Sequence, residues 1–284
     1  TGGAAGPEPG RYECPVSESQ RYESGLVVEN RGHVRVLTLD RPERRNALSS
    51  ELQADLVDQL LDAGEGGEVR AVVLTGTGPA FCAGFDLKEI REKDERGERF
   101  RPPMNRPGRS LFEVVTETPV PIVAALQGHA VAGGFELALA CDLRIAAPGI
   151  KLGLPEANLG LPPGAGGTQR LPRLVGPAKA KDLVFTGRMI DAQEALAIGL
   201  VDELCEPGAV LEAAKKKVAP FVNGPRLALR TAKASIAQGL QVDLATALRI
   251  ESTQFAGLFA TKDQQIGMDS FVENGPGKAQ FSGE

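Results

Sequence analysis

The chain places single carboxylates inside two apolar segments that are punctuated by glycine. Glu136 is the only acid in the stretch 130–140, and Glu156 is the only acid in the stretch 152–161. An ionised carboxylate in apolar surroundings is costly unless it is paired or strongly hydrogen-bonded. Burial also raises the pKa of such a group toward the range that suits proton transfer. The fold therefore has to supply specific partners for both side chains.

Glu136 and Glu156 are candidates for acid/base catalysis, because two such groups are the minimum equipment for proton transfer without a metal. The alternative is that Glu136 helps to cap its own helix and that Glu156 lies in a solvated turn. Either residue alone leaves both interpretations open. The glycine-rich segments around the pair favour the catalytic one.

Composition narrows the class of protein. The chain has 284 residues and is 42% hydrophobic, which allows one large domain with an appendage. Its net charge of −5 provides no basic face for a nucleic acid. No apolar run reaches the roughly 18 residues that a membrane span needs, and no apolar signal segment stands at the N-terminus. We therefore expect neither a nucleic acid nor a membrane among the partners.

Cysteine and histidine are sparse and scattered. Neither His33 nor His129 stands near a cysteine or an acidic cluster at metal-ligand spacing, so we predict no metal site. No G-x-S-x-G elbow accompanies them, which argues against a Ser-His-Asp hydrolase. The four cysteines have no paired spacing, which favours reduced thiols in a cytoplasmic protein over a disulfide framework. They are Cys14, Cys82, Cys141 and Cys205.

Three regions are expected along the chain. Residues 1–23 are rich in Gly, Pro, Glu and Ser, and we predict a disordered tail or an added remnant there. Residues 24–221 are predicted to form the core. Residues 222–284 are predicted to form helices whose apolar faces need a partner, either the core or a neighbouring subunit. The apolar positions of that last region are Leu244, Leu248, Phe255, Leu258, Phe259, Ile266, Met268 and Phe271.

Within the core region, strand and helix patterns alternate. Residues 25–29 and 34–39 flank Asn30-Arg31-Gly32 and predict a hairpin. A capping signature at Ser50…Gln53 precedes a helix with one apolar face. Short buried strands are predicted at 72–74 and 120–125, so the domain is expected to be α/β.

The segment Arg91–Arg109 is different, since it is dense in both charges, contains three prolines and has no apolar stripe. We predict a solvated, mobile excursion. Its excess of arginine over acid also leaves room for contact with an anionic ligand, which would order the segment.

Two glycine-rich turns could bring backbone close to a ligand. One spans residues 76–87, after a predicted strand, and the other is Gly133-Gly134, before the helix that carries Glu136. Phe81 occupies the position where a dinucleotide fingerprint needs its last glycine. Such turns still expose backbone N–H groups that stabilise a developing negative oxygen, and Ala83 and Gly133 could supply one each. Tight turns alone are the alternative explanation.

Several ordered motifs together resemble the crotonase superfamily, also called the enoyl-CoA hydratase/isomerase family. The run 81–87 (FCAGFDL) looks like the first oxyanion segment of that family, and 128–138 (GHAVAGGFELA) looks like the second. The run 154–171, from Leu154-Pro155-Glu156 to Gln169-Arg170-Leu171, resembles the third block. Weaker likeness begins at Arg41-Pro42 and continues to about residue 201. The resemblance thus covers nearly everything after residue 24.

The resemblance implies a spiral of repeated β-β-α units, with a C-terminal helical region that mediates trimers, often paired into hexamers. It also implies an acyl-CoA thioester substrate, no cofactor besides the CoA of the substrate, and a carbonyl oxygen held between the N–H groups of Ala83 and Gly133. The residues expected to contact substrate or CoA are Phe81, Gly84, Phe85, Asp86, Leu87, Gly134, Lys278 and Phe281. For Lys278 and Phe281, which would reach a CoA in this or a neighbouring subunit, the alternative is a surface tail.

Family hydratases carry two glutamates, and Glu136 and Glu156 match both positions, so we predict an enoyl-CoA hydratase of fatty acid metabolism. It would add water reversibly, with syn geometry, to a trans-2-enoyl-CoA and give a 3-hydroxyacyl-CoA. The alternatives are an enoyl-CoA isomerase that uses Glu156 alone, and a specialised acyl-CoA dehydratase or lyase. A non-catalytic or RNA-binding family member is an alternative of another class.

Two positions depart from the family pattern. Ala132 stands where many hydratases have a further glycine, and we expect alanine to be tolerated there if its φ is negative. Phe85 replaces a small residue before the aspartate, so the acyl pocket is expected to be reshaped. Neither change removes a catalytic group.

Overall fold

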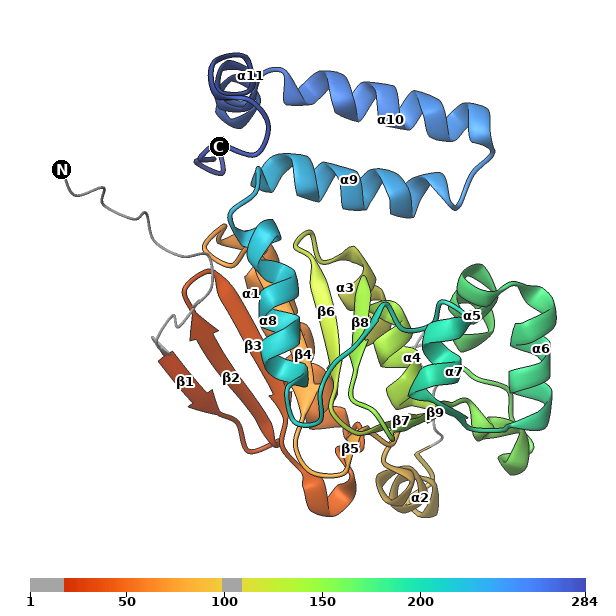
Figure 1. Cartoon of the computed structure of the whole chain (residues 1–284). Coiled ribbons are helices and arrows are strands. Elements are labelled where there is room, and N and C mark those ends of the chain that lie inside the picture. Colours follow the sequence, from red (N-terminus) through yellow and green to blue (C-terminus); the bar gives the residue numbers. More distant parts are fainter. Residues whose placement is uncertain (1–17, 99–108) are drawn as a thin grey trace.

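The computed structural model describes residues 18–98 and 109–284. Its largest element is a seven-stranded sheet in the order β1-β2-β3-β4-β6-β8-β11 (Figure 1). The first three strands pair antiparallel, and every later pair is parallel. The strands are β1 (Glu18–Arg21), β2 (Leu26–Arg31), β3 (Val34–Leu39), β4 (Ala71–Gly76), β6 (Ile122–Leu126), β8 (Leu143–Ala146) and β11 (Glu203–Leu204).

A second, four-stranded sheet has the order β10-β9-β7-β5. Its strands are β5 (Ala80–Cys82), β7 (His129–Val131), β9 (Lys151–Gly153) and β10 (Ile190–Asp191). Three times in succession the chain adds one strand to the large sheet and the next strand to the small one, and then enters a helical segment. This repeat confirms the predicted α/β spiral of β-β-α units.

The large sheet is buried on both faces, as expected for parallel strands. In register across it, Val36, Val73 and Val123 form one row, and they pack against α8 (Val210–Val222). The next row, which includes Leu37 and Leu74, faces the main core on the other side. The helices that contribute to that core include α1 (Ser50–Glu65), α3 (Leu111–Glu117) and α4 (Gly133–Ala140).

The remaining core elements surround the small sheet. They are η1 (Pro42–Arg44), α2 (Leu87–Glu95), the 3₁₀ helix η3 (Pro155–Leu159), α5 (Gly167–Val175), α6 (Pro177–Thr186) and α7 (Ala192–Ala197). Part of the predicted Arg91–Arg109 excursion, up to Glu95, therefore forms the end of α2. Residues 99–108 of that segment lie outside the described residues.

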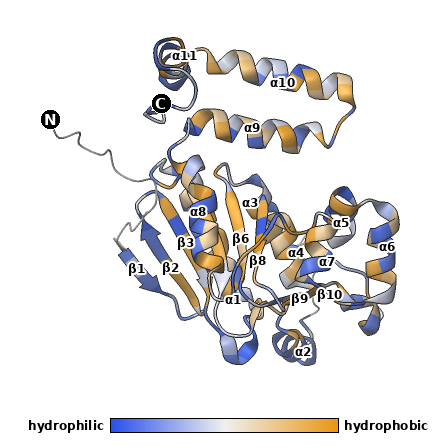
Figure 2. Ribbon diagram, in the orientation of Figure 1, coloured by the Kyte–Doolittle hydropathy of each residue, from blue (hydrophilic) through white to orange (hydrophobic). Residues whose placement is uncertain are grey.

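The C-terminal helices form an arm that stands apart from the sheets (Figure 1). The arm consists of α9 (Arg226–Gly239), α10 (Leu244–Leu258) and α11 (Lys262–Asn274). Lys233 of α9 ties it to the core by donating to Asp142 at 2.7 Å and to the Val120 carbonyl at 3.0 Å. Hydrophobic residues lie along these helices (Figure 2), and several are more than half exposed. They are Ile236, Leu240, Leu244, Leu248, Phe255, Phe259, Met268, Phe271 and Val272.

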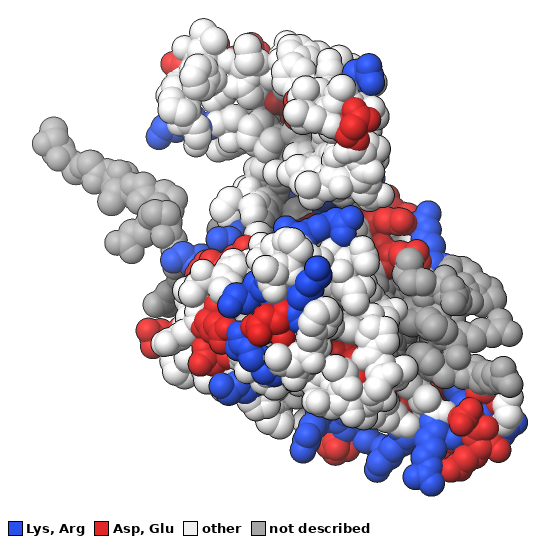
Figure 3. Space-filling view, turned by 90° about the vertical axis from the view of Figure 1, so that its right-hand side faces the viewer, with Lys and Arg blue, Asp and Glu red and all other residues white. Residues whose placement is uncertain are grey.

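Charge is distributed differently over the arm and the core. On the face shown in Figure 3 the arm is largely uncharged, whereas acidic and basic side chains lie interspersed over the core below it. Within residues 18–98 and 109–284, no helix is long and apolar enough to cross a membrane.

Two local expectations are corrected by the structure. Residues 18–21, expected in a disordered tail, form β1, which pairs antiparallel with β2; residues 1–17 lie outside the described part of the chain. Helix α1 is capped by Ser49 rather than Ser50, because the Ser49 hydroxyl accepts the Leu52 N–H at 3.2 Å.

Candidate active site

Glu136 is positioned by a sharp turn between β7 and α4. The turn residue is Ala132, with φ 50° and ψ −128°, and its carbonyl accepts the N–H groups of Phe135 and Glu136, both at 2.9 Å. We expected alanine to be tolerated here if its φ is negative, and the structure does not meet that condition. The positive φ strains an alanine by ~1–2 kcal/mol. The turn places Glu136 in the first turn of α4, where the helix dipole favours a negative charge.

The Glu136 side chain is buried and oriented by backbone. It is 1% exposed, and its Oε1 accepts hydrogen bonds from the N–H groups of Ala165 and Gly167, each at 2.8 Å. No hydrogen bond from the described part of the chain reaches Oε2. One carboxylate oxygen is therefore fixed, while the other remains for a ligand or a water.

Opposing influences act on the pKa of Glu136. Burial raises it, whereas the Gly167 and Ala165 N–H groups and the positive charge of Arg170 lower it, and the net direction is upward. Two backbone donors and a nearby guanidinium thus partly offset a strong desolvation penalty. This is how the fold accommodates the isolated carboxylate.

Glu156 has contrasting surroundings. It lies in η3, just after Pro155, and is half-buried. Its Oε2 is buried and has no hydrogen-bond partner among the described residues. Burial, together with the negative charge of Glu136, raises the pKa of Glu156 to about 7. The two carboxylates therefore lie close enough to influence each other, and Glu156 changes protonation near neutral pH.

The backbone N–H of Gly133 points out of the start of α4. Gly133 is the first residue of that helix, and none of the described residues accepts its N–H. Gly84, with φ 96°, approaches so closely that a Cβ built on it would lie 3.0 Å from the Gly133 nitrogen. The two glycine turns of the sequence therefore meet beside Glu136.

The role of Ala83 as a second N–H donor to the substrate stays a prediction. The Ala83 N–H donates to the backbone carbonyl of Arg45 at 3.0 Å, so it is already engaged within the fold. Arg45 and Asn46 both have positive φ, and the wholly buried Asn46 side chain ties this loop to Arg41, Thr77 and Ala80. No motif near Ala83 indicates that this loop reaches it.

Known proteins are similar to this chain in both sequence and fold. The family model for enoyl-CoA hydratase/isomerase matches residues 29–284. The chain belongs to the enoyl-CoA hydratase/isomerase family. This agrees with the resemblance inferred from its motifs.

Individual family members match over nearly their whole length. Short-chain-enoyl-CoA hydratase from Clostridium acetobutylicum is 39% identical, with 88% of this chain and 95% of that protein covered. Mitochondrial methylglutaconyl-CoA hydratase from Mus musculus is 40% identical, covering 99% of this chain and 90% of that protein. The crystal structure of enoyl-CoA hydratase from Bacillus anthracis has a TM-score of 0.84 at 40% identity, and the match covers 92% of this chain and 100% of that one.

Three residues predicted to contact substrate have structural roles in the fold, and their contact with substrate stays a prediction. Phe81 is fully buried in the core. Asp86 caps α2 by accepting the N–H groups of Lys88 and Glu89, and it pairs with Arg41 at 3.5 Å. Gly134 packs against β5 so tightly that a Cβ would lie 2.1 Å from the Cys82 carbonyl oxygen.

Other predicted contact residues remain accessible. Phe85 is half-buried, and its ring lies against Gly133 and edge-to-face with Phe112 at a centroid distance of 6.0 Å. Leu87 is 61% exposed. Lys278 is exposed and Phe281 is half-buried against Gly267, in a segment that lies beside the arm and not beside α4 (Figure 1).

Arg170 lies in the third of the family-like motifs, and the sequence assigns it no role. In the structure it lies close enough to Glu136 for its positive charge to lower the pKa of that carboxyl. A basic residue that follows a glycine run and precedes an apolar helix face is a weak signal in sequence. Among the described residues, no group of three or more His, Cys, Asp or Glu side chains is arranged to hold a metal ion.

Proposed function

We propose that this protein is an enoyl-CoA hydratase in which Glu136 and Glu156 act together as base and acid. The observation that carries this proposal is the contrast between the two carboxylates: Glu136 is buried with one oxygen fixed, and Glu156 has a pKa of about 7. A fixed carboxylate base beside an acid with a pKa near neutral pH is the pair that addition of water across a double bond requires.

The proposed reaction begins with the thioester carbonyl. Its oxygen would accept the free N–H of Gly133, beside Gly84 and Phe85, which polarises the conjugated double bond and makes Cβ electrophilic. The loss of one such donor typically lowers the rate by about 10²–10³.

The glutamates would then complete the addition. Glu136 takes one proton from a water whose hydroxyl adds to Cβ, and Glu156 delivers its proton to Cα. Hydroxyl and proton together make up one water. The starting state returns when the proton gained by Glu136 is exchanged for the one lost by Glu156. Alternatively, both side chains hold one water in a nearly concerted step.

Incubation of the purified protein with crotonyl-CoA tests this function. Loss of the enoyl absorbance supports hydration, and an unchanged spectrum at high enzyme concentration rejects it for this short substrate. We propose that no cofactor takes part beyond the CoA of the substrate. Full activity after treatment with a chelator and dialysis is the expected result.

Double-bond isomerisation is the second candidate, and one observation favours it. Among the described residues, Glu156 alone combines a pKa near 7 with a buried oxygen that lacks a hydrogen-bond partner, so it could shuttle a proton by itself. A 3-enoyl-CoA substrate distinguishes the two reactions. Conversion by the Glu136→Gln variant at the wild-type rate would favour the isomerase.

We propose that the protein assembles as a trimer or as a dimer of trimers. Support comes from the apolar side chains of the arm, which are more than half exposed in the single chain (Figure 2). A second copy of the chain is the proposed occupant, and in the assembly Lys278 and Phe281 would reach the CoA of a neighbouring subunit. Light scattering tests this, and a monodisperse monomer of 29.9 kDa would refute it.

We also propose a cytoplasmic location. Cys82, Cys141 and Cys205 are free thiols, as expected in a reducing compartment. Cell fractionation checks this proposal.

A further inference from the structure

We propose that Arg170 is a positioning residue that clamps the loop holding Glu136 and supplies its counter-charge. The inference rests on the proposed role of Glu136 as a base. It concerns the loop of residues 163–167, which we call the Glu136 loop, and the neighbouring helix α3.

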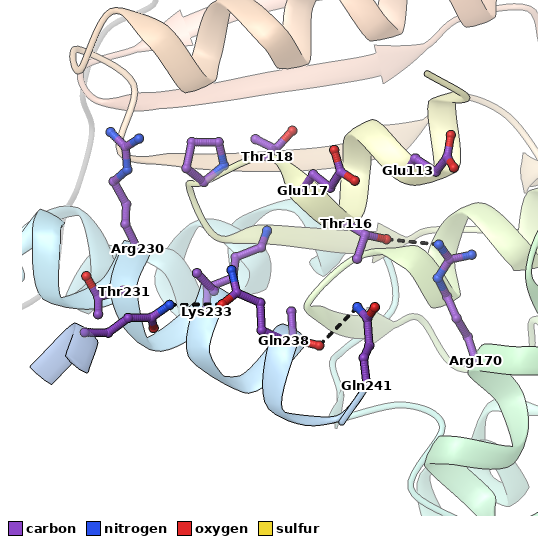
Figure 4. A pocket seen from close by; sticks show the side chains of 14 residues that line it. Glu113, Thr116, Glu117, Thr118, Arg170, Arg230, Thr231, Lys233, Gln238 and Gln241 are labelled. Atoms are coloured by element: carbon purple, nitrogen blue, oxygen red, sulfur yellow. Dashed lines mark hydrogen bonds between the residues drawn. The ribbon is translucent and has the colours of Figure 1, made fainter. Parts of the chain in front are cut away.

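The guanidinium of Arg170 joins this loop to α3. Its Nη1 donates to the carbonyl of Ala165 at 3.0 Å. Its Nη2 donates to the Phe112 carbonyl at 3.1 Å and to the Thr116 hydroxyl at 3.0 Å. Figure 4 shows the side chain extending from α5 toward Thr116. Three hydrogen bonds therefore hold the loop at a fixed distance from α3.

The clamped residue is the same one that orients the carboxylate. The N–H of Ala165 donates to Glu136 Oε1 at 2.8 Å, while its carbonyl accepts from Arg170. A shift of the loop would therefore move one of the two donors on Glu136. Misplacement of a reacting group by about 1 Å can lower the rate about 10²-fold.

Glycine at position 166 makes this contact possible. Gly166 has φ 108°, and a Cβ built there would lie 1.9 Å from Arg170 Nη1. The guanidinium thus lies close against the backbone of the Glu136 loop at Gly166. Loop and arginine are complementary in shape as well as in hydrogen bonding.

Electrostatics supports the same assignment. Burial raises the pKa of Glu136, and the Arg170 charge is the positive charge that opposes this. The other ionisable groups that act on the pair are Glu156, which faces Glu136, and Glu113 and Cys141, which interact with Arg170. Burial lowers the pKa of Arg170 itself, and the charge of Glu136 raises it.

Three variants test the proposal in steady-state hydration of crotonyl-CoA. Arg170→Gln removes both the positive charge and the guanidinium that bonds to the loop and to α3. Arg170→Lys keeps the charge but not the guanidinium. Arg173→Gln, on the exposed side of α5, is the matched control. The wild-type rate is measured first, because its absence would reject the proposed function and not this inference. Thermal unfolding establishes that each variant is folded.

We expect Arg170→Gln to lower kcat by about 10-fold or more while KM changes less than about threefold. Without the positive charge the pKa of Glu136 rises, so the acidic limb of the kcat/KM profile moves to higher pH. Arg170→Lys should lower kcat with little movement of that limb, and Arg173→Gln should match the wild type.

Two results would overturn the proposal. If Arg170→Gln lowers kcat but leaves the acidic limb of the pH profile unmoved, Arg170 has a purely structural role and supplies no counter-charge to Glu136. Should Arg170→Gln fail to fold, Arg170→Lys decides, because a wild-type kcat in that variant removes the need for the forked contact.

Discussion

The segments that carry the two glutamates differ in how completely the fold satisfies them. Around Glu136, two backbone N–H groups, a helix N-terminus and Arg170 all stabilise a negative charge. Around Glu156, a buried oxygen has no partner among the described residues. Burial raises the pKa of both glutamates; at Glu136 these groups partly offset it, whereas the pKa of Glu156 is about 7. In the proposed reaction, this difference in surroundings separates base from acid.

The largest expected effect comes from removing either carboxylate. Glu136→Gln and Glu156→Gln should each lower hydration of crotonyl-CoA by at least about 10²-fold, because each loses a general acid or base. The measurement is kcat for each purified, folded variant. Glu65→Gln, which changes an exposed acid at the end of α1, is the control. Near-normal turnover in either variant would show that the reaction does not need one glutamate as base and the other as acid.

The next largest effect is the pH dependence of kcat/KM, which tests the protonation of Glu156. If Glu156 must be protonated, kcat/KM should fall about tenfold per pH unit above its pKa of about 7. Because the folded pKa lies above the unfolded one, the protonated carboxyl contributes stability below pH ~4.3 that is lost as the pH rises through 7.

The wild type should therefore lose stability between pH 5 and pH 8, and Glu156→Gln should lose less, by about 1–2 kcal/mol. Urea unfolding at the two pH values measures this difference. Equal pH dependence in both proteins would show that the fold does not penalise ionisation of Glu156.

Crowding around the fixed oxygen of Glu136 gives a smaller effect. A Cβ on Gly167 would lie 3.0 Å from Glu136 Oε1 and 2.9 Å from Leu154 Cδ1. Gly167→Ala should therefore shift the carboxylate and lower kcat by about 10-fold. Gly164→Ala in the same loop is the matched control, since a Cβ there meets nothing within 4 Å. Equal activity in both variants would mean that Glu136 needs no such exact placement.

The smallest expected effect concerns the turn before Glu136. Ala132→Gly should raise the free energy of unfolding by up to ~1 kcal/mol, because glycine adopts the positive φ without strain. Thermal or urea unfolding measures it. Ala195→Gly, within the helix α7, should lower stability instead. A less stable Ala132→Gly protein would show that the alanine methyl contributes more than the strain costs.

The family, the repeated β-β-α units and both glutamates could be predicted because they depend on ordered local motifs. Contacts with distant loops could not be predicted. The Ala83 N–H donates to the carbonyl of Arg45, and nothing near Ala83 in sequence indicates that contact. Asp86 lies in a motif that suggests a ligand, yet its carboxylate caps α2.

The backbone conformation at Ala132 and the pairing of the edge strand β1 could not be predicted from the sequence either. The sign of φ at Ala132 follows from the turn that joins β7 to α4, and alanine itself carries no signal for it. Residues 18–21 have no alternation of apolar and polar side chains, because no side of that strand is buried. A pattern method detects burial, so it overlooks a strand held by backbone hydrogen bonds alone.

That strand, β1, has a practical consequence for protein production. All four of its residues are exposed, and Glu18 and Arg21 bring charge to the rim of the sheet. Charged, short rim strands discourage edge-to-edge aggregation between molecules. A chain shortened to begin at residue 24 would transfer the rim to β2, which is longer and has Leu26 and Val28 buried on its inner face. Such a truncation would present an open row of backbone donors and acceptors, and would precipitate more readily than the chain that keeps Glu18–Arg21.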